Sequence, residues 1–192
     1  MAKKAGAPRL LSMERAVSKV AEFLSLLCER LSAVSKGLLV LLGAAMSVIV
    51  LLQVIFRFVI HVPFPWSEEI ARYMMIWMGM VGAFLALRQG RHIGVSIFVD
   101  RLPPSWKAMV TILVQVVTMG FLCIVVRYGM ALAIFNRTQL SPAMQIPMII
   151  PYMAIPVGAA LMILELLRGI LEDLMHMREG PKRRLTSATL EG

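Results

Sequence analysis

Four apolar segments dominate the chain, and short polar or charged stretches separate them. Three of them, residues 37–56, 108–126 and 138–164, contain no charged residue. About 20 residues of α-helix cross the roughly 30 Å of hydrocarbon in a lipid bilayer. Each of these three segments is therefore long enough to contain a transmembrane helix.

The fourth apolar segment, residues 73–87, has only 15 residues, which is short for a membrane span. Ser67 is a favourable helix N-cap, and Glu68 and Glu69 would lie in the first turn, where carboxylates stabilise the helix dipole. We therefore expect a helix that begins at the membrane surface and runs to Gln89. The four expected spans are residues 37–59, 67–89, 106–128 and 147–171.

The residues before the first span carry a helical pattern of their own. Between Met13 and Val34, apolar residues recur at intervals of three and four, and polar residues lie mostly opposite them. This pattern predicts an amphipathic helix on the cytoplasmic membrane surface. Its acidic and basic residues cancel, so the apolar stripe would hold it to lipid or to a partner protein. The stripe consists of Val17, Val20, Ala21, Leu24, Leu27, Cys28, Leu31 and Val34.

Composition supports a membrane protein. A hydrophobic content of 59% and a mean hydropathy of +0.79 exclude an ordinary soluble domain. The net charge of +9 does not indicate nucleic-acid binding, because the basic residues lie between apolar segments and do not cluster on one polar surface. The predicted fold class is an all-α integral membrane protein with four transmembrane helices and an N-terminal amphipathic helix.

The basic residues predict the orientation. Sixteen of the 20 Lys and Arg residues lie in residues 1–36, 88–107 and 168–192. The positive-inside rule places both termini and the middle loop in the cytoplasm. We expect a multi-pass protein of the bacterial inner membrane, in which a transmembrane domain over residues 37–172 lies between two cytoplasmic tails, 1–36 and 173–192.

Few polar groups lie where a transport or catalytic site would need them. Ion-coupled transporters carry ionisable groups near the bilayer midplane, but the central parts of the first three spans contain none. Gln53 and Gln115 are their strongest polar residues, and Glu165 in the fourth span can pair with Arg168 at i+3. The histidines and cysteines lack the spacing of a metal site or a catalytic triad.

We therefore expect no catalytic residue, metal, cofactor or substrate-binding site in this chain. The alternative is an autonomous four-helix transporter or channel, which would need a polar midplane. A membrane enzyme is a third class, and it would need clustered catalytic groups near the interface.

A charged cluster marks the predicted periplasmic entry of the second span. Glu68 and Glu69 are spaced from Arg72 for ion pairs at i+4 and i+3. Arg57, at the end of the first span, would join them and fasten the two helices together. The adjacent Trp66 fits an aromatic belt at the membrane interface. We expect this cluster to have a structural role.

Small residues on the second span suggest close helix packing. Gly79 and Ala83, like Gly82 and Ala86, are four residues apart, a spacing that lets two helix backbones approach closely. We expect this part of the span to contact another membrane subunit.

The cytoplasmic exit of the same span is basic. Arg88, Arg91 and His92 follow the apolar segment directly. They would anchor the helix end at the cytoplasmic surface, and the alternative is a contact with lipid headgroups.

Two blocks of residues resemble a known family. Pro65-Trp66-Ser67-Glu68-Glu69 and Gly90-Arg91-His92-Ile93 flank one membrane helix. A second block runs from Gln139-x-Ser141-Pro142-Ala143 to Ile155-Pro156-Val157-Gly158. These motifs resemble the small membrane subunit, the Q component or DctQ-like family, of tripartite ATP-independent periplasmic (TRAP) transporters.

The resemblance implies partners for the chain. In this family, a large membrane subunit carries the sodium and substrate sites, and a soluble periplasmic binding protein captures the substrate. The small subunit would enlarge a stationary scaffold around an elevator-like motion and help form the periplasmic docking surface. The imported solute would be a small organic acid or a related anion, selected by residues in the other chains.

Overall fold

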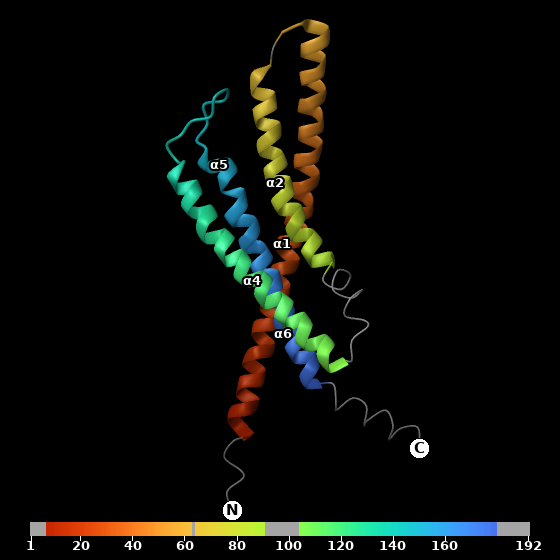
Figure 1. The fold of residues 1–192 in the computed structure, drawn as a ribbon. Coiled ribbons are helices and arrows are strands. Elements are labelled where there is room, and N and C mark those ends of the chain that lie inside the picture. The colour runs from red at the N-terminus through yellow and green to blue at the C-terminus, as the bar shows by residue number, and fades with distance from the viewer. Residues whose placement is uncertain (1–6, 63, 91–103, 180–192) are drawn as a thin grey trace, which may run out of the picture.

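The computed structural model describes residues 7–62, 64–90 and 104–179. These residues form helices and connecting turns, with one isolated antiparallel bridge between Leu140 and Pro147. The order of elements is α1 (Ala7–Ile55), η1 (Phe56–Ile60), α2 (Pro65–Gly90), α4 (Pro104–Phe135), α5 (Ile149–Tyr152) and α6 (Ala154–Glu179), as Figure 1 shows.

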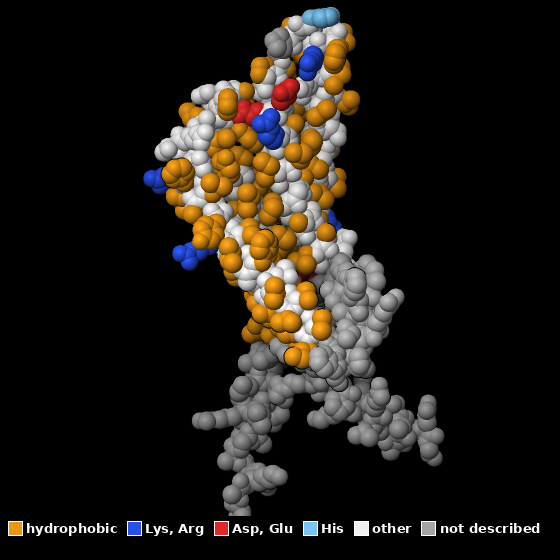
Figure 2. Space-filling view, viewed as in Figure 1, with side chains coloured by type: hydrophobic (Ala, Val, Ile, Leu, Met, Phe, Trp, Pro, Cys, Tyr) orange, Lys and Arg blue, Asp and Glu red, His pale blue; other side chains and the backbone are white. Residues whose placement is uncertain are grey.

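Four helical stretches are long and apolar enough to cross a membrane, which confirms the predicted all-α fold with four spans. Hydrophobic side chains cover the middle of the face seen in Figure 2, as expected of a surface that lies in lipid or against another membrane protein. The stretches are Lys19–Ile60, Pro65–Gln89, Ile112–Phe135 and Ile149–Glu172.

The ends of two spans differ from the prediction. α2 begins at Pro65, because proline is well tolerated at the first position of a helix, and Ser67 is not its N-cap. The Ser67 hydroxyl instead donates to the carbonyl of Phe64 at 2.6 Å. α4 continues past the expected end at residue 128 to Phe135, because the intervening residues are apolar and include no proline.

α1 joins two elements that we expected to be separate. The boundary expected between residues 36 and 37 is not a helix end, because no proline interrupts this region and Gly37 alone does not break the helix. From Cys28 onward, less exposed residues recur every three or four positions along one side of α1, a spacing that keeps them facing the same neighbours. This row includes Cys28, Ser32, Ser35, Leu39, Leu42, Met46, Ile49 and Gln53.

The amphipathic segment is partly used within the chain. Ala21 and Cys28 are buried, and α1 packs against α6 as well as α2. Val20, Leu27 and Val34, on the same predicted stripe, stay exposed. One side of the stripe therefore packs within the chain, and its exposed side is left for contact with lipid or a partner protein.

Helix α6 lies at the centre of the packing. It contacts α1, α2 and α4, whereas α4 packs mainly along α5 and α6 (Figure 1). Gly158 lies so close to α2 that a Cβ added there would be 2.7 Å from the Met80 Cβ. Gly129 lies at the corresponding close approach of α4 to α6, where an added Cβ would be 3.2 Å from Ile155 of α6. Glycines thus set the spacing on both sides of α6.

The start of the fourth span is divided into two helical elements. α5 ends at Tyr152 and α6 begins at Ala154, so one residue, Met153, separates them. Pro156 lacks the amide hydrogen that would bond to the Tyr152 carbonyl, and its ring crowds that carbonyl. The proline therefore explains the break between α5 and α6.

The turn between α1 and α2 is closed by aromatic rings. The π-helical η1 ends at Ile60, and the next residue, His61, has a left-handed backbone with a φ of 60°. Phe64 stacks on Phe56 at a centroid distance of 4.7 Å and contacts Trp66 at 4.5 Å. Trp66 is therefore part of this turn as well as partly exposed at the end of α2.

Candidate functional site

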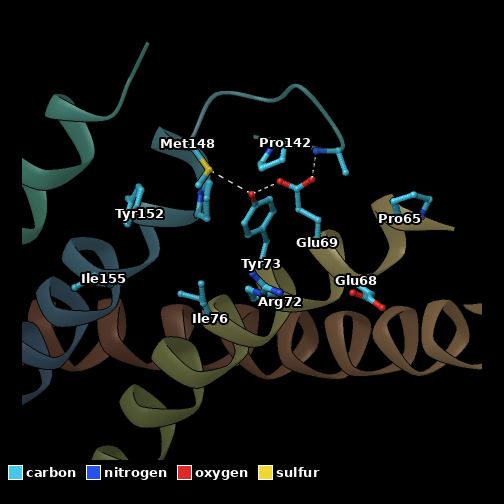
Figure 3. A pocket seen from close by; sticks show the side chains of 12 residues that line it. Pro65, Glu68, Glu69, Arg72, Tyr73, Ile76, Pro142, Met148, Tyr152 and Ile155 are labelled. Carbon is cyan, nitrogen blue, oxygen red and sulfur yellow. Dashed lines mark hydrogen bonds between the residues drawn. The ribbon is translucent and has the colours of Figure 1, made fainter. Parts of the chain in front are cut away.

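Glu69 fastens α2 to the loop between α4 and α5. Its Oε2 accepts hydrogen bonds from the backbone amides of Ala143 and Met144, each at 2.9 Å. Its Oε1 accepts a hydrogen bond from the Tyr73 hydroxyl, one turn further along α2 (Figure 3). A carboxylate that accepts from several donors makes strong, charge-assisted hydrogen bonds. Glu69 thus joins elements that are more than 70 residues apart in sequence.

The loop that Glu69 holds is also bonded to itself. The amide of Ser141 donates to the Ile146 carbonyl at 2.9 Å, and the amide of Met148 donates to the Gln139 carbonyl at 2.9 Å. Gln145 has a left-handed φ of 54°, and its side-chain amide donates to the Ser141 carbonyl at 3.0 Å. These bonds give the loop a compact shape.

The charged cluster predicted at this end is arranged differently. Glu68 accepts a hydrogen bond from Gln53 of α1 at 3.0 Å, so this pair, and not Arg57, connects α1 to α2. Arg72 forms no ion pair with a carboxylate among the described residues. Arg57 forms none there either, and its guanidinium lies 5.7 Å from the Phe58 ring centroid. The i+3 and i+4 spacing permits the predicted pairs, but Glu69 is already bonded to the loop.

A cavity of about 560 Å³ lies next to Glu69, between α2 and the start of the fourth span (Figure 3). Its outer part is lined by charged and phenolic side chains, and its inner part by apolar side chains. The lining residues are Pro65, Glu68, Glu69, Arg72, Tyr73, Ile76, Pro142, Ala143, Met148, Pro151, Tyr152 and Ile155.

A second polar cluster lies at the opposite end of α2. Glu165 is fully buried, and its Oε1 accepts from Arg168 Nη2 at 3.0 Å, which confirms the predicted i+3 pair. Its Oε2 lies 3.6 Å from Nη1 of Arg88 on α2. Arg168 also donates to Glu172 at 2.7 Å. Buried Cys28 of α1 lies beside Glu165, so the cluster connects three helices.

Arg88 therefore forms an internal ion pair, which the sequence reasoning missed when it assigned this residue to the membrane surface. The signal was the isolated Glu165 in an apolar span, because a buried carboxylate is costly unless cations and hydrogen-bond donors surround it, and these can come from another helix. Arg91 and His92, predicted to anchor the same end, lie outside the described residues.

The small residues predicted to pack against another subunit divide into two sets. Gly82 faces α1, since a Cβ added there would be 4.0 Å from Leu39. An added Cβ at Gly79 would have no atom of this chain within 4 Å, and Ala83 is exposed on the same side of α2. Gly79 and Ala83 thus lie on the outer surface, whereas Gly82 is used inside the chain.

Two further residues that matter for the site were not predicted. Tyr73 is buried and bonds to Glu69, and its hydroxyl also lies 3.3 Å from the sulfur of Met148. The four-residue spacing of Glu69 and Tyr73 on one helix face could have indicated their contact. Gly158 lies at the close approach of α2 and α6. It belongs to the Ile155-Pro156-Val157-Gly158 motif, but nothing in that motif indicates which helix it contacts.

Comparison with known proteins identifies the family. The family model of tripartite ATP-independent periplasmic transporters, DctQ component, matches residues 46–176, which is more than half of the chain. An isethionate TRAP transporter permease protein, DctMQ, of Oleidesulfovibrio alaskensis is 34% identical over 55% of this chain and 17% of its own length. The C4-dicarboxylate TRAP transporter small permease protein DctQ of Rhodobacter capsulatus is 28% identical over 50% of this chain and 44% of its own.

A third relative matches over a larger share of both chains. The ectoine TRAP transporter small permease protein TeaB of Halomonas elongata is 28% identical over 69% of this chain and 68% of its own length. The present chain thus covers less than half of the isethionate and C4-dicarboxylate relatives, and about two thirds of the ectoine relative. Because the matched residues reach from the second half of the first span to the end of the fourth and include the Glu69 contacts and the Glu165 ion pairs, the chain belongs to the DctQ family of TRAP transporter small membrane subunits.

Proposed function

We propose that this chain is a non-catalytic scaffold subunit of a sodium-driven, binding-protein-dependent TRAP transporter that imports a small organic acid. The observation that supports this proposal best is the attachment of α2 at both ends. Glu69 bonds to the α4–α5 loop at one end, and Arg88 pairs with Glu165 at the other. A helix held at both ends suits a stationary element better than a moving one.

The interior of the spans supports the same proposal. Residues 37–56, 73–87 and 109–126 contain no charged side chain, and Glu165 is already paired with two arginines. A sodium-coupled site needs coordinating groups away from the membrane surface. The sodium and substrate sites would therefore lie in a large membrane subunit.

The relatives support such a partnership. The matched region makes up only 17% of the DctMQ permease protein, so in that protein the equivalent of this chain is a small part of a longer permease. The relatives are named for different solutes, namely isethionate, C4-dicarboxylates and ectoine. This variety fits a subunit that supports transport without choosing the solute.

We place both termini in the cytoplasm, following the distribution of Lys and Arg. The turn between α1 and α2 and the loop held by Glu69 would then face the periplasm together. Because Glu69 fixes this loop against α2, the two form a defined surface on which a periplasmic binding protein could dock.

Reconstitution of the full chain into proteoliposomes tests this function. The chain alone should show no sodium-driven uptake of the solute, whereas uptake should appear when the large subunit and the loaded binding protein are added. Sodium-driven uptake by the chain alone would show that it is an autonomous transporter. Uptake by the large subunit and binding protein at full rate without this chain would contradict a scaffold role.

A further inference from the structure

The cavity beside Glu69 changes from polar to apolar along α2. Its lining runs from Pro65 to Ile76, which corresponds to about 16 Å at a rise of 1.5 Å per residue. Glu68 and Arg72 lie toward the start of the helix, and Ile76 and Ile155 lie toward the membrane interior (Figure 3). This order of polar and apolar groups matches the change across the headgroup region of a bilayer.

Arg72 brings a positive charge to this cavity. It is exposed, and it forms no ion pair with a carboxylate among the residues that the structure describes. The Glu69 carboxylate is already occupied by two backbone amides and by Tyr73. Arg72 lies seven residues inside the span that begins at Pro65, about 10 Å along the helix. A charge in this region of a membrane is costly unless an anion accompanies it.

Glu68 adds a negative charge to the same cavity, one helical turn before Arg72. Its Oε1 accepts from Gln53 at 3.0 Å, and its Oε2 has no hydrogen bond among the residues that the structure describes. In Figure 2, acidic and basic side chains meet near the upper end of the visible face, with hydrophobic side chains below them. The cavity thus offers one cationic contact, one anionic contact and an apolar inner wall.

We propose that this cavity binds one phospholipid with a phosphoethanolamine headgroup, taken from the leaflet at this end of the helices. The Arg72 guanidinium binds the phosphate, because its planar donors match phosphate oxygens. The Glu68 carboxylate binds the ammonium group, and the acyl chains pass over Ile76 and Ile155 into the bilayer.

The surroundings favour a lipid over a soluble phosphoester. Met75 of α2 and Ile150 of α5, next in sequence to cavity residues, are 56% and 50% exposed. Exposed apolar side chains at the edge of a charged cavity fit acyl chains, and they offer nothing to a small hydrophilic anion. The lipid proposal does not depend on the proposed transport function, because all the residues that line the cavity belong to this chain.

Native mass spectrometry of the full chain, purified in mild detergent, tests the proposal. Wild-type protein should retain one phosphatidylethanolamine, and Arg72→Gln should weaken its binding about ten-fold, which corresponds to roughly 1.4 kcal/mol. Arg57→Gln is the matched control, because Arg57 is exposed at the same end but outside the cavity. Equal binding by wild type and Arg72→Gln, or equal loss in both variants, would overturn the proposal.

Two further measurements identify the headgroup and the source of the phosphate. Glu68→Gln should keep phospholipid binding but lose the preference for phosphatidylethanolamine over phosphatidylglycerol; an unchanged preference would overturn the assignment of the ammonium contact. Soluble glycerophosphoethanolamine should not displace the bound lipid at equal concentration. Displacement would show a site for a soluble phosphoester. Unchanged melting temperatures of the variants would exclude misfolding as the cause of lipid loss.

Discussion

Glu69 and Glu165 are two buried carboxylates in apolar helices, and each stabilises a different kind of contact. Glu69 accepts backbone amides from a loop and the hydroxyl of Tyr73. Glu165 balances Arg88 and Arg168, which come from α2 and α6. Both carboxylates avoid the cost of burial because each has several donors or cations around it.

Replacing Glu165 tests the cluster that it forms with Arg88 and Arg168. Glu165→Gln should lower the free energy of unfolding by about 3 kcal/mol, because it leaves Arg88 and Arg168 without their shared anion. Glu172→Gln is the control, since Glu172 also pairs with Arg168 but is partly exposed, and its loss should cost roughly 0–1 kcal/mol. Denaturation of both variants in detergent by SDS titration measures the difference. Equal stabilities would mean that the Glu165 contacts contribute no more than a surface pair.

Replacing Glu69 tests the loop attachment. Glu69→Gln removes the negative charge that strengthens the hydrogen bonds from the Ala143 and Met144 amides, and it replaces one accepting carboxylate oxygen with a donor group. We expect a lower melting temperature and faster proteolysis of the α4–α5 loop than in wild type. Gln53→Leu removes only the bond to Glu68 and serves as the control, with the loop still protected. A loop equally protected in both variants would show that Glu69 does not hold it.

Local spacing predicted some of these contacts but not others. The i+3 pair of Glu165 and Arg168 follows from one helix and was predicted correctly. Arg88 and the amides of Ala143 and Met144 come from other elements, so no spacing within α2 or α6 indicates them. The predicted pairing of Arg72 failed for the same reason, because its expected partner Glu69 binds a loop more than 70 residues away.

At the scale of elements, hydrophobic segments predict which helices exist, whereas their ends depend on local residues. Three of the four spans were expected from apolar length alone, and the second also from the helix-start residues before it. The ends differ where the chain keeps good helix formers, as in the apolar turns that extend α4 to Phe135. The continuity of α1 through residue 36 has the same origin, since a change from amphipathic to wholly apolar sequence does not end a helix.

Helix spacing around α6 provides a test at this scale. Gly158→Ala should destabilise the protein by about 1–3 kcal/mol, because the new Cβ would lie 2.7 Å from the Met80 Cβ and would push α2 away from α6. Gly79→Ala is the matched control on α2. No atom lies within 4 Å of its new Cβ, so the change should be neutral or stabilise the helix by up to about 1 kcal/mol.

Unfolding by SDS titration measures both glycine variants. If Gly158→Ala were as stable as wild type, α2 and α6 would have room to separate without loss of packing, and the close approach at Gly158 would not limit their spacing.

At the scale of the whole molecule, the outer surface of α2 differs from its inner surface. The inner surface carries Gly82, which faces Leu39 of α1, and Met80, which meets Gly158 of α6. The outer surface carries Gly79 and Ala83 with nothing of this chain over them. Since small residues let helices approach closely in membranes, the outer surface is the part of α2 that a large subunit could contact.

A bulky residue on this surface separates assembly from folding. Gly79→Leu should leave the melting temperature of the purified chain within a few degrees of wild type, because the new side chain meets open space. The same variant should recover much less of the large subunit when the two are co-expressed and co-purified, because leucine would hold the partner helix away from the α2 backbone. Gly82→Leu is the contrasting control: it would press on Leu39 and lower the stability of the chain itself. Full recovery of the large subunit with Gly79→Leu would place the contact on another surface, such as the exposed side of α4.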